Sequence, residues 1–468
     1  MDQATIRRLS DEATEKLLNK TGTAASSRGG WMMIATILIE AWDLYALAFV
    51  LVFVKDEYNP SPAALGLLTA GVQGGALLGA LLGGYVADRL GRKRVFILTM
   101  ILFIILALVQ GFSQNIWDLI IMRFLIGIPL GSDISNGYTY IMESMSKKSR
   151  ELMGSRWQGM FGLGEVFSIL VITALYLFDM HTDTLWRVAL ALGAVPALIL
   201  LLARLNLPET PASLIQRGQF VKAKQVSREL FDDPLDMLPD HDVPIEKAKV
   251  GDFLKVIWAD PIKRKASIFG WISNACQGAE FAAFGFYLPV ILVTAGVGVS
   301  GKDITGTNIV TAVIFSIATV AGFLAPWMIN KTGHRGVAMW GYGLAFLGLL
   351  IGAFALAVDI KWLIVVGAIV LMWGHYWDAS NGMTICSMVA PPRFKGTASG
   401  FGYVFVKAAA FFGAFVFPIM TAAWGKVGAT LAVSVLSLIG FVSARFILPE
   451  VYGYIESEEV PATSGAGG

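Results

Sequence analysis

The chain contains 468 residues, of which 56% are hydrophobic and 15% are charged, and its formal net charge is +2. Because globular domains carry about 25% charged residues, this composition excludes an ordinary water-soluble protein and indicates a chain that lies mostly in lipid. No basic stretch is interleaved with aromatic residues, so a nucleic-acid partner is also excluded.

Apolar segments long enough to cross about 30 Å of hydrocarbon follow one another along the chain. They cover residues 31–54, 62–86, 95–113, 117–141, 157–178, 186–205, 266–294, 307–329, 337–357, 362–389, 399–422 and 427–447. The sequence therefore predicts an all-α integral membrane protein with twelve transmembrane helices in two six-helix bundles. The expected parts are an N-terminal segment (1–28), a first bundle (29–205), a linker (206–265), a second bundle (266–448) and a tail (449–468).

The loops between these segments predict the orientation of the chain. Lys and Arg gather in the even-numbered loops, with Arg89, Lys147 and Lys331 among them, and the odd-numbered loops are richer in Asp and Glu. Short basic loops stay on the cytoplasmic side, so we expect a multi-pass protein of the cell (inner or plasma) membrane with both termini in the cytoplasm. The polar first 28 residues do not resemble a cleaved signal peptide.

The two halves repeat one another. GGYVADRLGRKR at 83–94 returns, eroded, as PWMINKTGHR at 326–335, an offset of 330 − 88 = 242 residues, and Leu-Pro-Glu recurs at an offset of 449 − 208 = 241. Echoes at one offset indicate a duplicated membrane protein. Within the first loop we predict a latch that stabilises one conformation, formed by Asp88, Arg89, Gly91 and Arg92.

Three acidic residues interrupt the apolar segments of the first half, where a charge is costly and marks a functional candidate. Glu40 and Asp43 are three residues apart on one helical face, so we expect their repulsion to favour one shared proton. Asp133 follows Arg123 by ten residues, about 15 Å along a helix, which places it near mid-depth. We predict that Glu40, Asp43 and Asp133 couple transport to protons; helix-to-helix hydrogen bonding is the alternative for Asp133.

Lys407 lies deep in an apolar segment, where Tyr403 is its one polar neighbour. Its ammonium group needs an anion from elsewhere, which is either the substrate or a protein carboxylate. Glu40 and Glu280 are 240 residues apart, and Glu165 and Lys407 are 242 apart, so each pair occupies similar places in the two halves. We expect these groups to face each other across the axis between the halves.

Further polar and aromatic side chains are candidates for the wall of a binding site. They are Gln158, Asn274, Gln277, Trp271 and Tyr376. Together with Lys407 and Glu280 they make up the predicted substrate-binding set. Cys276 and Cys386 are interpreted as packing residues, and no nucleophile with its base and no metal-ligand spacing is found, so we expect no enzyme activity, no cofactor and no metal.

Several motifs resemble those of the major facilitator superfamily. GGYVADRLGRKR resembles its loop motif, RFLIGIPLGSD its fourth-helix motif, and LPETPASLIQRGQ the sugar-porter motif after the sixth helix. EAWDLY is similar to the paired acids of the phosphate:proton and aromatic-acid:proton symporters, and Asp133, Gln158 and Lys407 match polar positions of that branch. The resemblance implies the major facilitator fold, in which two bundles rock about a midplane site and each contains an inverted repeat.

Together these features predict a secondary active transporter, namely a proton-coupled symporter that takes up a small anion by alternating access. Lys407 would pair with that anion. The alternative is a neutral solute such as a sugar, with Lys407 bridged to a protein acid. A membrane sensor would need a larger output module than the linker offers. The expected partners are the solute, protons and the lipid bilayer, and the chain is expected to be a monomer.

Overall fold

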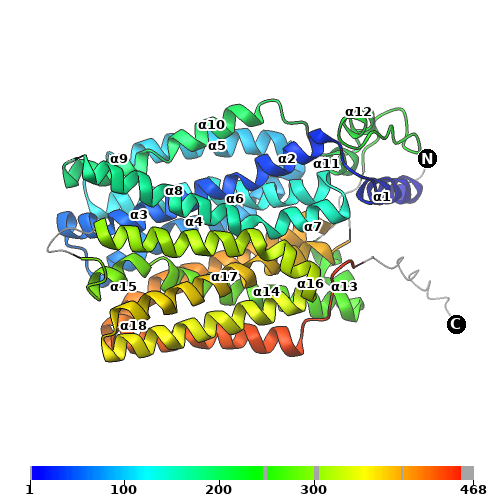
Figure 1. The fold of residues 1–468 in the computed structure, drawn as a ribbon. Helices are drawn as coiled ribbons and strands as arrows, with labels where there is room; N and C mark the ends of the chain where they lie inside the picture. Colours follow the sequence, from blue (N-terminus) through cyan, green and yellow to red (C-terminus); the bar gives the residue numbers. More distant parts are fainter. Residues whose placement is uncertain (1–2, 179, 246–249, 300–304, 392–393, 455–468) are drawn as a thin grey trace.

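The structure is a computed structural model that describes residues 3–178, 180–245, 250–299, 305–391 and 394–454, and its regular elements are helices (Figure 1). The first half contains α1 (Gln3–Asn19), α2 (Ala24–Ile34), α3 (Thr36–Tyr58), α4 (Pro62–Leu90), α5 (Arg92–Gln110), α6 (Ile116–Ser144), α7 (Lys147–Ser155), α8 (Trp157–Leu177), α9 (Thr182–Ala191) and α10 (Ala194–Arg204). The predicted linker contains α11 (Pro211–Gln216), α12 (Phe220–Phe231) and α13 (Val250–Ala259).

The second half contains α14 (Pro261–Glu280), a π-helical turn η1 (Phe281–Gly285), α15 (Leu288–Thr294), α16 (Thr305–Val358), α17 (Lys361–Met388) and α18 (Lys395–Phe446). Two of these helices are each a hairpin of two spans, because α16 breaks at Gly333 (φ 71°) and α18 at Gly425 (φ 69°). Positive φ favours glycine, which has no Cβ to clash. Among the described residues, the first half has six spans (α2 with α3, α4, α5, α6, α8, and α9 with α10) and the second half also has six (α14 with α15, two in α16, α17, and two in α18). The prediction of twelve transmembrane helices is confirmed.

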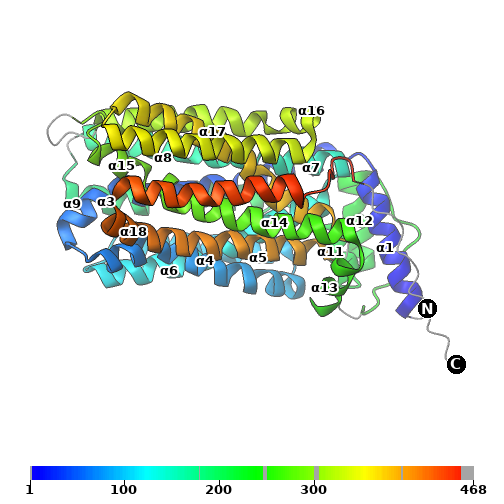
Figure 2. The ribbon, with the colours of Figure 1, turned by 90° about the horizontal axis from the view of Figure 1, so that it is seen from below.

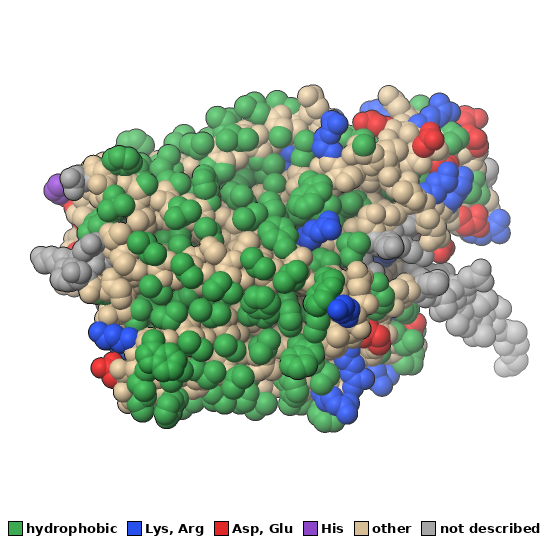
Figure 3. All heavy atoms as spheres, in the orientation of Figure 1, with side chains coloured by type: hydrophobic (Ala, Val, Ile, Leu, Met, Phe, Trp, Pro, Cys, Tyr) green, Lys and Arg blue, Asp and Glu red, His purple; other side chains and the backbone are tan. Residues whose placement is uncertain are grey.

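The face of the bundle seen in Figure 3 is mainly apolar along its length, and most of its charged side chains lie toward the ends of the bundle. Large hydrophobic side chains of the bundle are exposed, with Phe112 and Phe446 both 77% exposed. Side chains of this kind belong against lipid, and helices satisfy their own backbone hydrogen bonds in that environment. The described helices thus form a multi-pass membrane protein.

Helices α1, α11, α12 and α13 gather at one end of the bundle, which we call the linker end (Figure 1). Leu17 of α1 packs there in one apolar cluster with Ile215 and Phe220. Lys20 Nζ lies 2.6 Å from the Asp233 carboxylate. Burial raises the pKa of Asp233, but hydrogen bonds from Lys20, from a backbone N–H and from Lys16 together lower it to about 2. This ion pair joins α1 to the linker helices.

The two halves meet along α4 against α18 and α8 against α16 (Figure 2). Within the first half, α4 and α6 approach so closely that a Cβ on Gly75 would lie 1.9 Å from the Phe124 carbonyl oxygen. On the other helix, a Cβ on Gly127 would lie 2.1 Å from the Val72 carbonyl oxygen. Small residues allow this approach in lipid, where close packing replaces the hydrophobic force.

Candidate functional site

A cavity of about 70 Å³ lies between the two halves. It is lined by Glu40, Leu44, Gln73, Trp157, Gln158, Phe161, Gln277, Gly278, Phe281, Ala282, His375, Ala379, Tyr403, Val406, Lys407 and Ala410. These residues come from α3, α4 and α8 of the first half and from α14, η1, α17 and α18 of the second. A site built from both halves is the arrangement that alternating access requires.

A buried ion pair crosses this cavity from one half to the other. Lys407 Nζ donates to Glu40 Oε1 and, at 2.9 Å, to Gln73 Oε1. The Tyr403 hydroxyl donates to the same Glu40 oxygen at 3.2 Å. Lys407 and Glu40 are each only 5% exposed. The anion that the isolated lysine needs is therefore the Glu40 carboxylate, as the neutral-solute alternative expects, and Glu165 is not its partner.

The two acids of α3 do not pair with each other in the structure, contrary to the expectation of one shared proton. Arg123 Nη1 donates to Asp43 Oδ1 at 2.8 Å, while Glu40 pairs with Lys407. Each acid therefore has its own cationic partner. The Asp43 Oδ2 atom is buried and has no hydrogen-bond partner.

Asp133 lies outside the cavity wall. Arg204 Nη1 donates to both of its carboxylate oxygens at 3.0 Å, and the Thr99 hydroxyl donates to Oδ1 at 3.0 Å. The same arginine also bonds Thr36 on α3. Asp133 thus joins α6 to α5, α10 and α3, which is the structural alternative considered for it.

Three members of the predicted substrate-binding set line the cavity, namely Lys407, Gln158 and Gln277, and four do not. Trp271 stacks on Phe405 with ring centroids 5.7 Å apart. The Tyr376 hydroxyl donates to Glu165, Asn274 is buried in α14 beside Gly382, and Glu280 accepts from Ser437.

Sequence reasoning missed Gln73 and Arg204. Gln73 lies in the glycine-rich second span, where it and Thr69 are the polar side chains between Leu65 and Gly84. Arg204 ends the sixth span, where a basic residue is common and therefore gives no signal. Asp43 and Arg123 are 80 positions apart. A contact between such distant residues cannot be recognised from the pattern of one sequence.

The cavity wall combines amides with aromatic rings. Gln73, Gln158 and Gln277 each offer a donor and an acceptor, and Trp157, Phe161 and Phe281 offer ring faces. A few placed polar groups on a largely apolar wall are typical of small-molecule sites. This wall suits a solute that carries hydroxyl groups.

Contacts between the halves close the cavity at both ends. At the linker end, the Tyr138 and Thr384 hydroxyls are 2.6 Å apart. At the opposite end, the Thr69 hydroxyl is 2.8 Å from that of Tyr287, and Asn308 donates to Thr173 at 3.0 Å. Because small-molecule pockets usually exceed about 300 Å³, the halves must part before a solute can enter.

The predicted latch lies at the linker end, although the side chain of Asp88 is outside the described residues. Arg92 Nη2 donates to Glu143 at 3.2 Å. Gly91 adopts φ 96° between α4 and α5, and the Glu209 carboxylate accepts from the backbone N–H of Arg92 at 3.0 Å. Arg89 is exposed on the same turn. Arg92 and Gly91 thus connect α4, α5 and α6 with the chain that follows α10.

The second half repeats this arrangement. Glu450 accepts from the backbone N–H groups of His334, at 3.0 Å, and Arg335, at 3.2 Å, directly after Gly333. Both acids belong to the Leu-Pro-Glu repeats. The duplication inferred from the sequence is therefore visible as two equivalent carboxylate caps.

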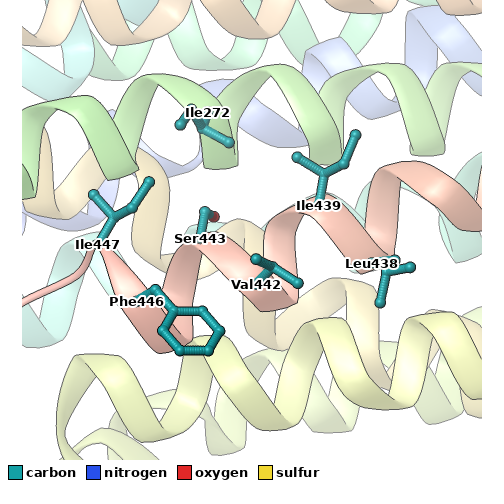
Figure 4. A pocket seen from close by; sticks show the side chains of 7 residues that line it. All are labelled: Ile272, Leu438, Ile439, Val442, Ser443, Phe446 and Ile447. Carbon is teal, nitrogen blue, oxygen red and sulfur yellow. The ribbon is translucent and has the colours of Figure 1, made fainter.

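A larger groove, of about 450 Å³, lies on the outside of the bundle between α14 and the second span of α18 (Figure 4). Six of its seven lining residues are apolar, and Ser443 is the exception. Such a surface offers nothing to orient a polar solute, so this groove is not a candidate transport site.

Comparison with known proteins gives one consistent result. A family model described as "Sugar (and other) transporter" matches residues 24–459. The probable metabolite transport protein CsbC of Bacillus subtilis is 26% identical over 441 residues, with 91% of this chain and 92% of that protein covered. The arabinose-proton symporter of Bacillus subtilis is 25% identical over 433 residues, with 88% and 89% covered.

Among solved structures, the major facilitator proton:xylose symporter XylE bound to 6-bromo-6-deoxy-D-glucose superposes with a TM-score of 0.73 at 16% identity. The alignment covers 92% of this chain and 97% of that one. The major facilitator fold predicted from the sequence motifs is thereby confirmed.

Proposed function

Because this chain belongs to the sugar (and other) transporter family, we propose that it is a proton-coupled symporter of a sugar or a similar neutral, hydroxyl-rich metabolite. Membership makes it a transporter rather than an enzyme. The proton and the sugar come from relatives, namely an arabinose-proton symporter and a proton:xylose symporter. The proposed direction is uptake, with the linker end in the cytoplasm.

The observation that carries the neutral substrate is the partner of Lys407. Its charge is balanced by Glu40 and it also donates to Gln73, so the described residues that line the cavity present no unpaired lysine or arginine to attract an anion. An anionic solute, the first expectation from the sequence, has less support than its alternative. Gln158 and Gln277 are the proposed partners for solute hydroxyls, and Phe161 and Phe281 the proposed ring faces.

The proposed proton carrier is Asp43. Its one carboxylate-bound cation is Arg123, and both side chains are at most 2% exposed. A proton on Asp43 would neutralise the carboxylate that pairs with Arg123. The buried guanidinium would then need another hydrogen-bond partner, and the packing of α3 against α6 would change. Breaking a buried pair has a large energetic effect, so this site can link protonation to conformation.

The function is tested in proteoliposomes with an imposed inward proton gradient. We expect arabinose or xylose to accumulate above its external concentration, and a protonophore to abolish accumulation while equilibration persists. Phosphate and benzoate serve as anionic comparisons. Concentrative uptake of an anion alone, or of sugar without a gradient, would show that the proposal is wrong.

Asp43→Asn isolates the coupling step. This variant should lose gradient-driven accumulation, to less than a tenth of the original, and should retain exchange of labelled for unlabelled sugar. The matched control is Asp56→Asn, an exposed acid at the end of α3, which should transport normally. Unchanged accumulation in Asp43→Asn would remove Asp43 from the coupling path.

A further inference from the structure

Three buried ionisable side chains gather in the second half, beside the cavity and apart from the Asp43 and Glu40 pairs. His375 Nδ1 lies 3.3 Å from Glu280 Oε1 and 3.8 Å from Asp378 Oδ1, and the three ligand atoms all lie within 4.8 Å of one another. Each side chain is at most 1% exposed. We call these three residues the α14–α17 cluster.

The cluster is short of hydrogen-bond partners. Both ring nitrogens of His375, both carboxylate oxygens of Asp378 and one oxygen of Glu280 are buried without one. Among the described residues, neither acid forms an ion pair with a lysine or arginine. Burying polar atoms in this way is costly unless something else binds them, and here the unpartnered His375 Nδ1 atom lies 3.3 Å from Glu280 Oε1 and 3.8 Å from Asp378 Oδ1.

Within the part of the chain that the structure describes, the groups around the cluster supply no compensating positive charge. Cys276 lies one turn before Glu280 on α14, and Tyr376 is next to His375 on α17. The Tyr342 hydroxyl of α16 bonds Ser273, and the Ser437 hydroxyl of α18 bonds the second oxygen of Glu280. Two carboxylates and one neutral imidazole become electrically neutral with either two added protons or one divalent cation.

The geometry points to a divalent transition-metal site. We propose that Glu280, His375 and Asp378 bind one zinc-class ion, with His375 Nδ1 and one oxygen of each acid as ligands. Zinc bound at roughly 2.0–2.2 Å in tetrahedral geometry separates its ligand atoms by about 3.4 Å. The two separations that involve His375 Nδ1 are close to this value, at 3.3 and 3.8 Å, and the ligand atoms of the two acids lie within 4.8 Å of each other. One imidazole with two carboxylates is a donor set that such ions accept.

Local structure holds these ligands in place and gives the ion a route. Phe281 stacks on the His375 ring at 4.8 Å, and Ser437 orients Glu280 from behind. Hydrogen bonds to ligands of this kind fix their orientation. Glu280 ends α14 where the π-helical turn η1 begins, and such turns are frequent at functional sites. His375 also lines the central cavity, so the ion can enter from there.

The test is titration of chelator-treated, purified protein with Co²⁺, which absorbs visible light strongly in a tetrahedral N/O site. We expect one equivalent to bind with that absorption and with release of about two protons, measured by calorimetry in buffers of different ionisation enthalpy. Bound Co²⁺ should also raise the thermal unfolding temperature, because it joins α14 to α17.

Near-isosteric variants locate the ion. His375→Gln, Glu280→Gln and Asp378→Asn should each weaken Co²⁺ binding at least tenfold. The control is His181→Gln, because His181 and Asp183 form an exposed pair, 3.4 Å apart, that can take up metal at the surface; it should leave binding unchanged.

The proposal is wrong if the unsubstituted protein shows no tetrahedral Co²⁺ absorption, because two protons then neutralise the cluster. It is equally wrong if the absorption disappears only in His181→Gln. Since the unsubstituted protein decides the first outcome, a variant that fails to fold does not remove the test.

Discussion

At the scale of single residues, three of the acids inside the membrane, Glu40, Asp43 and Asp133, are paired with cations from helices that lie far apart in the sequence. Lys407 and Glu40 are separated by 367 positions, and Arg204 and Asp133 by 71. A buried ion pair contributes little net stability, but loss of one partner is expensive because the other charge is left alone in a medium of low polarity.

This asymmetry predicts the behaviour of the Lys407–Glu40 pair. Lys407→Met should lower the free energy of unfolding by about 3–5 kcal/mol, since Glu40 is then buried without its cation. Adding Glu40→Gln should recover most of that loss, because neither charge remains. Equilibrium unfolding in mixed micelles measures both variants and hence their coupling.

The control for this cycle is Lys222→Met, which removes an exposed lysine of α12 and should change stability by less than about 0.5 kcal/mol. A double variant that is as unstable as Lys407→Met alone would contradict the pairing of Lys407 with Glu40.

The sequence identifies the charged residues inside the membrane more reliably than it identifies their ion-pair partners. Acids and a lysine inside apolar segments stand out because lipid is a poor solvent for ions. Their partners depend on how helices rotate and pack, and no pattern within one helix records that. Glu280 and Lys407 were assigned to one substrate site for this reason, although Glu280 lies beside His375 and Lys407 beside Glu40.

At the scale of helices, the glutamate of each Leu-Pro-Glu sequence caps the start of a helix. Glu209 follows α10 and caps the start of α5, and Glu450 follows α18 and caps the second span of α16. Each carboxylate accepts hydrogen bonds from backbone N–H groups in the first turn of a helix, at the positive end of the helix dipole. The apolar lengths and these repeats were enough to predict every membrane span, but not the breaks that divide α2 from α3 and α9 from α10.

Removal of either cap should have the same effect. Glu209→Ala and Glu450→Ala should each lower the free energy of unfolding by about 1–2 kcal/mol, and the double variant should show their sum because the caps lie in different halves. Glu229→Ala, at an exposed position of α12, is the control. Strongly unequal effects of the two substitutions would argue against equivalent caps.

At the scale of the whole molecule, the two halves are held together at both ends of the bundle. Tyr138 with Thr384 closes the linker end, and Thr69 with Tyr287 closes the opposite end. Alternating access requires one of these contacts to open while the other stays closed. A hydrogen bond contributes about 1 kcal/mol, which is enough to shift such a balance about fivefold.

Opposite substitutions should therefore shift the protein in opposite directions. Thr384→Val should favour opening at the linker end, and Thr69→Val at the other end, each by about fivefold in population. Distances between spin labels at 89 and 331, and between labels at 56 and 359, report the two ends. Thr421→Val is the control, because that hydroxyl bonds only within its own helix. Identical distance distributions in all three variants would show that these contacts do not set the balance.

The small volume of the closed cavity affects how solutes should be ranked. When only a fraction of the protein is in the form that can bind, the apparent dissociation constant of every solute is the intrinsic constant divided by that fraction. The order of affinity among candidate sugars is therefore preserved. The measured affinity of each sugar is lower than its intrinsic affinity for the amides and aromatic rings of the open cavity. A variant that favours an open form is the better reagent for detecting weak ligands.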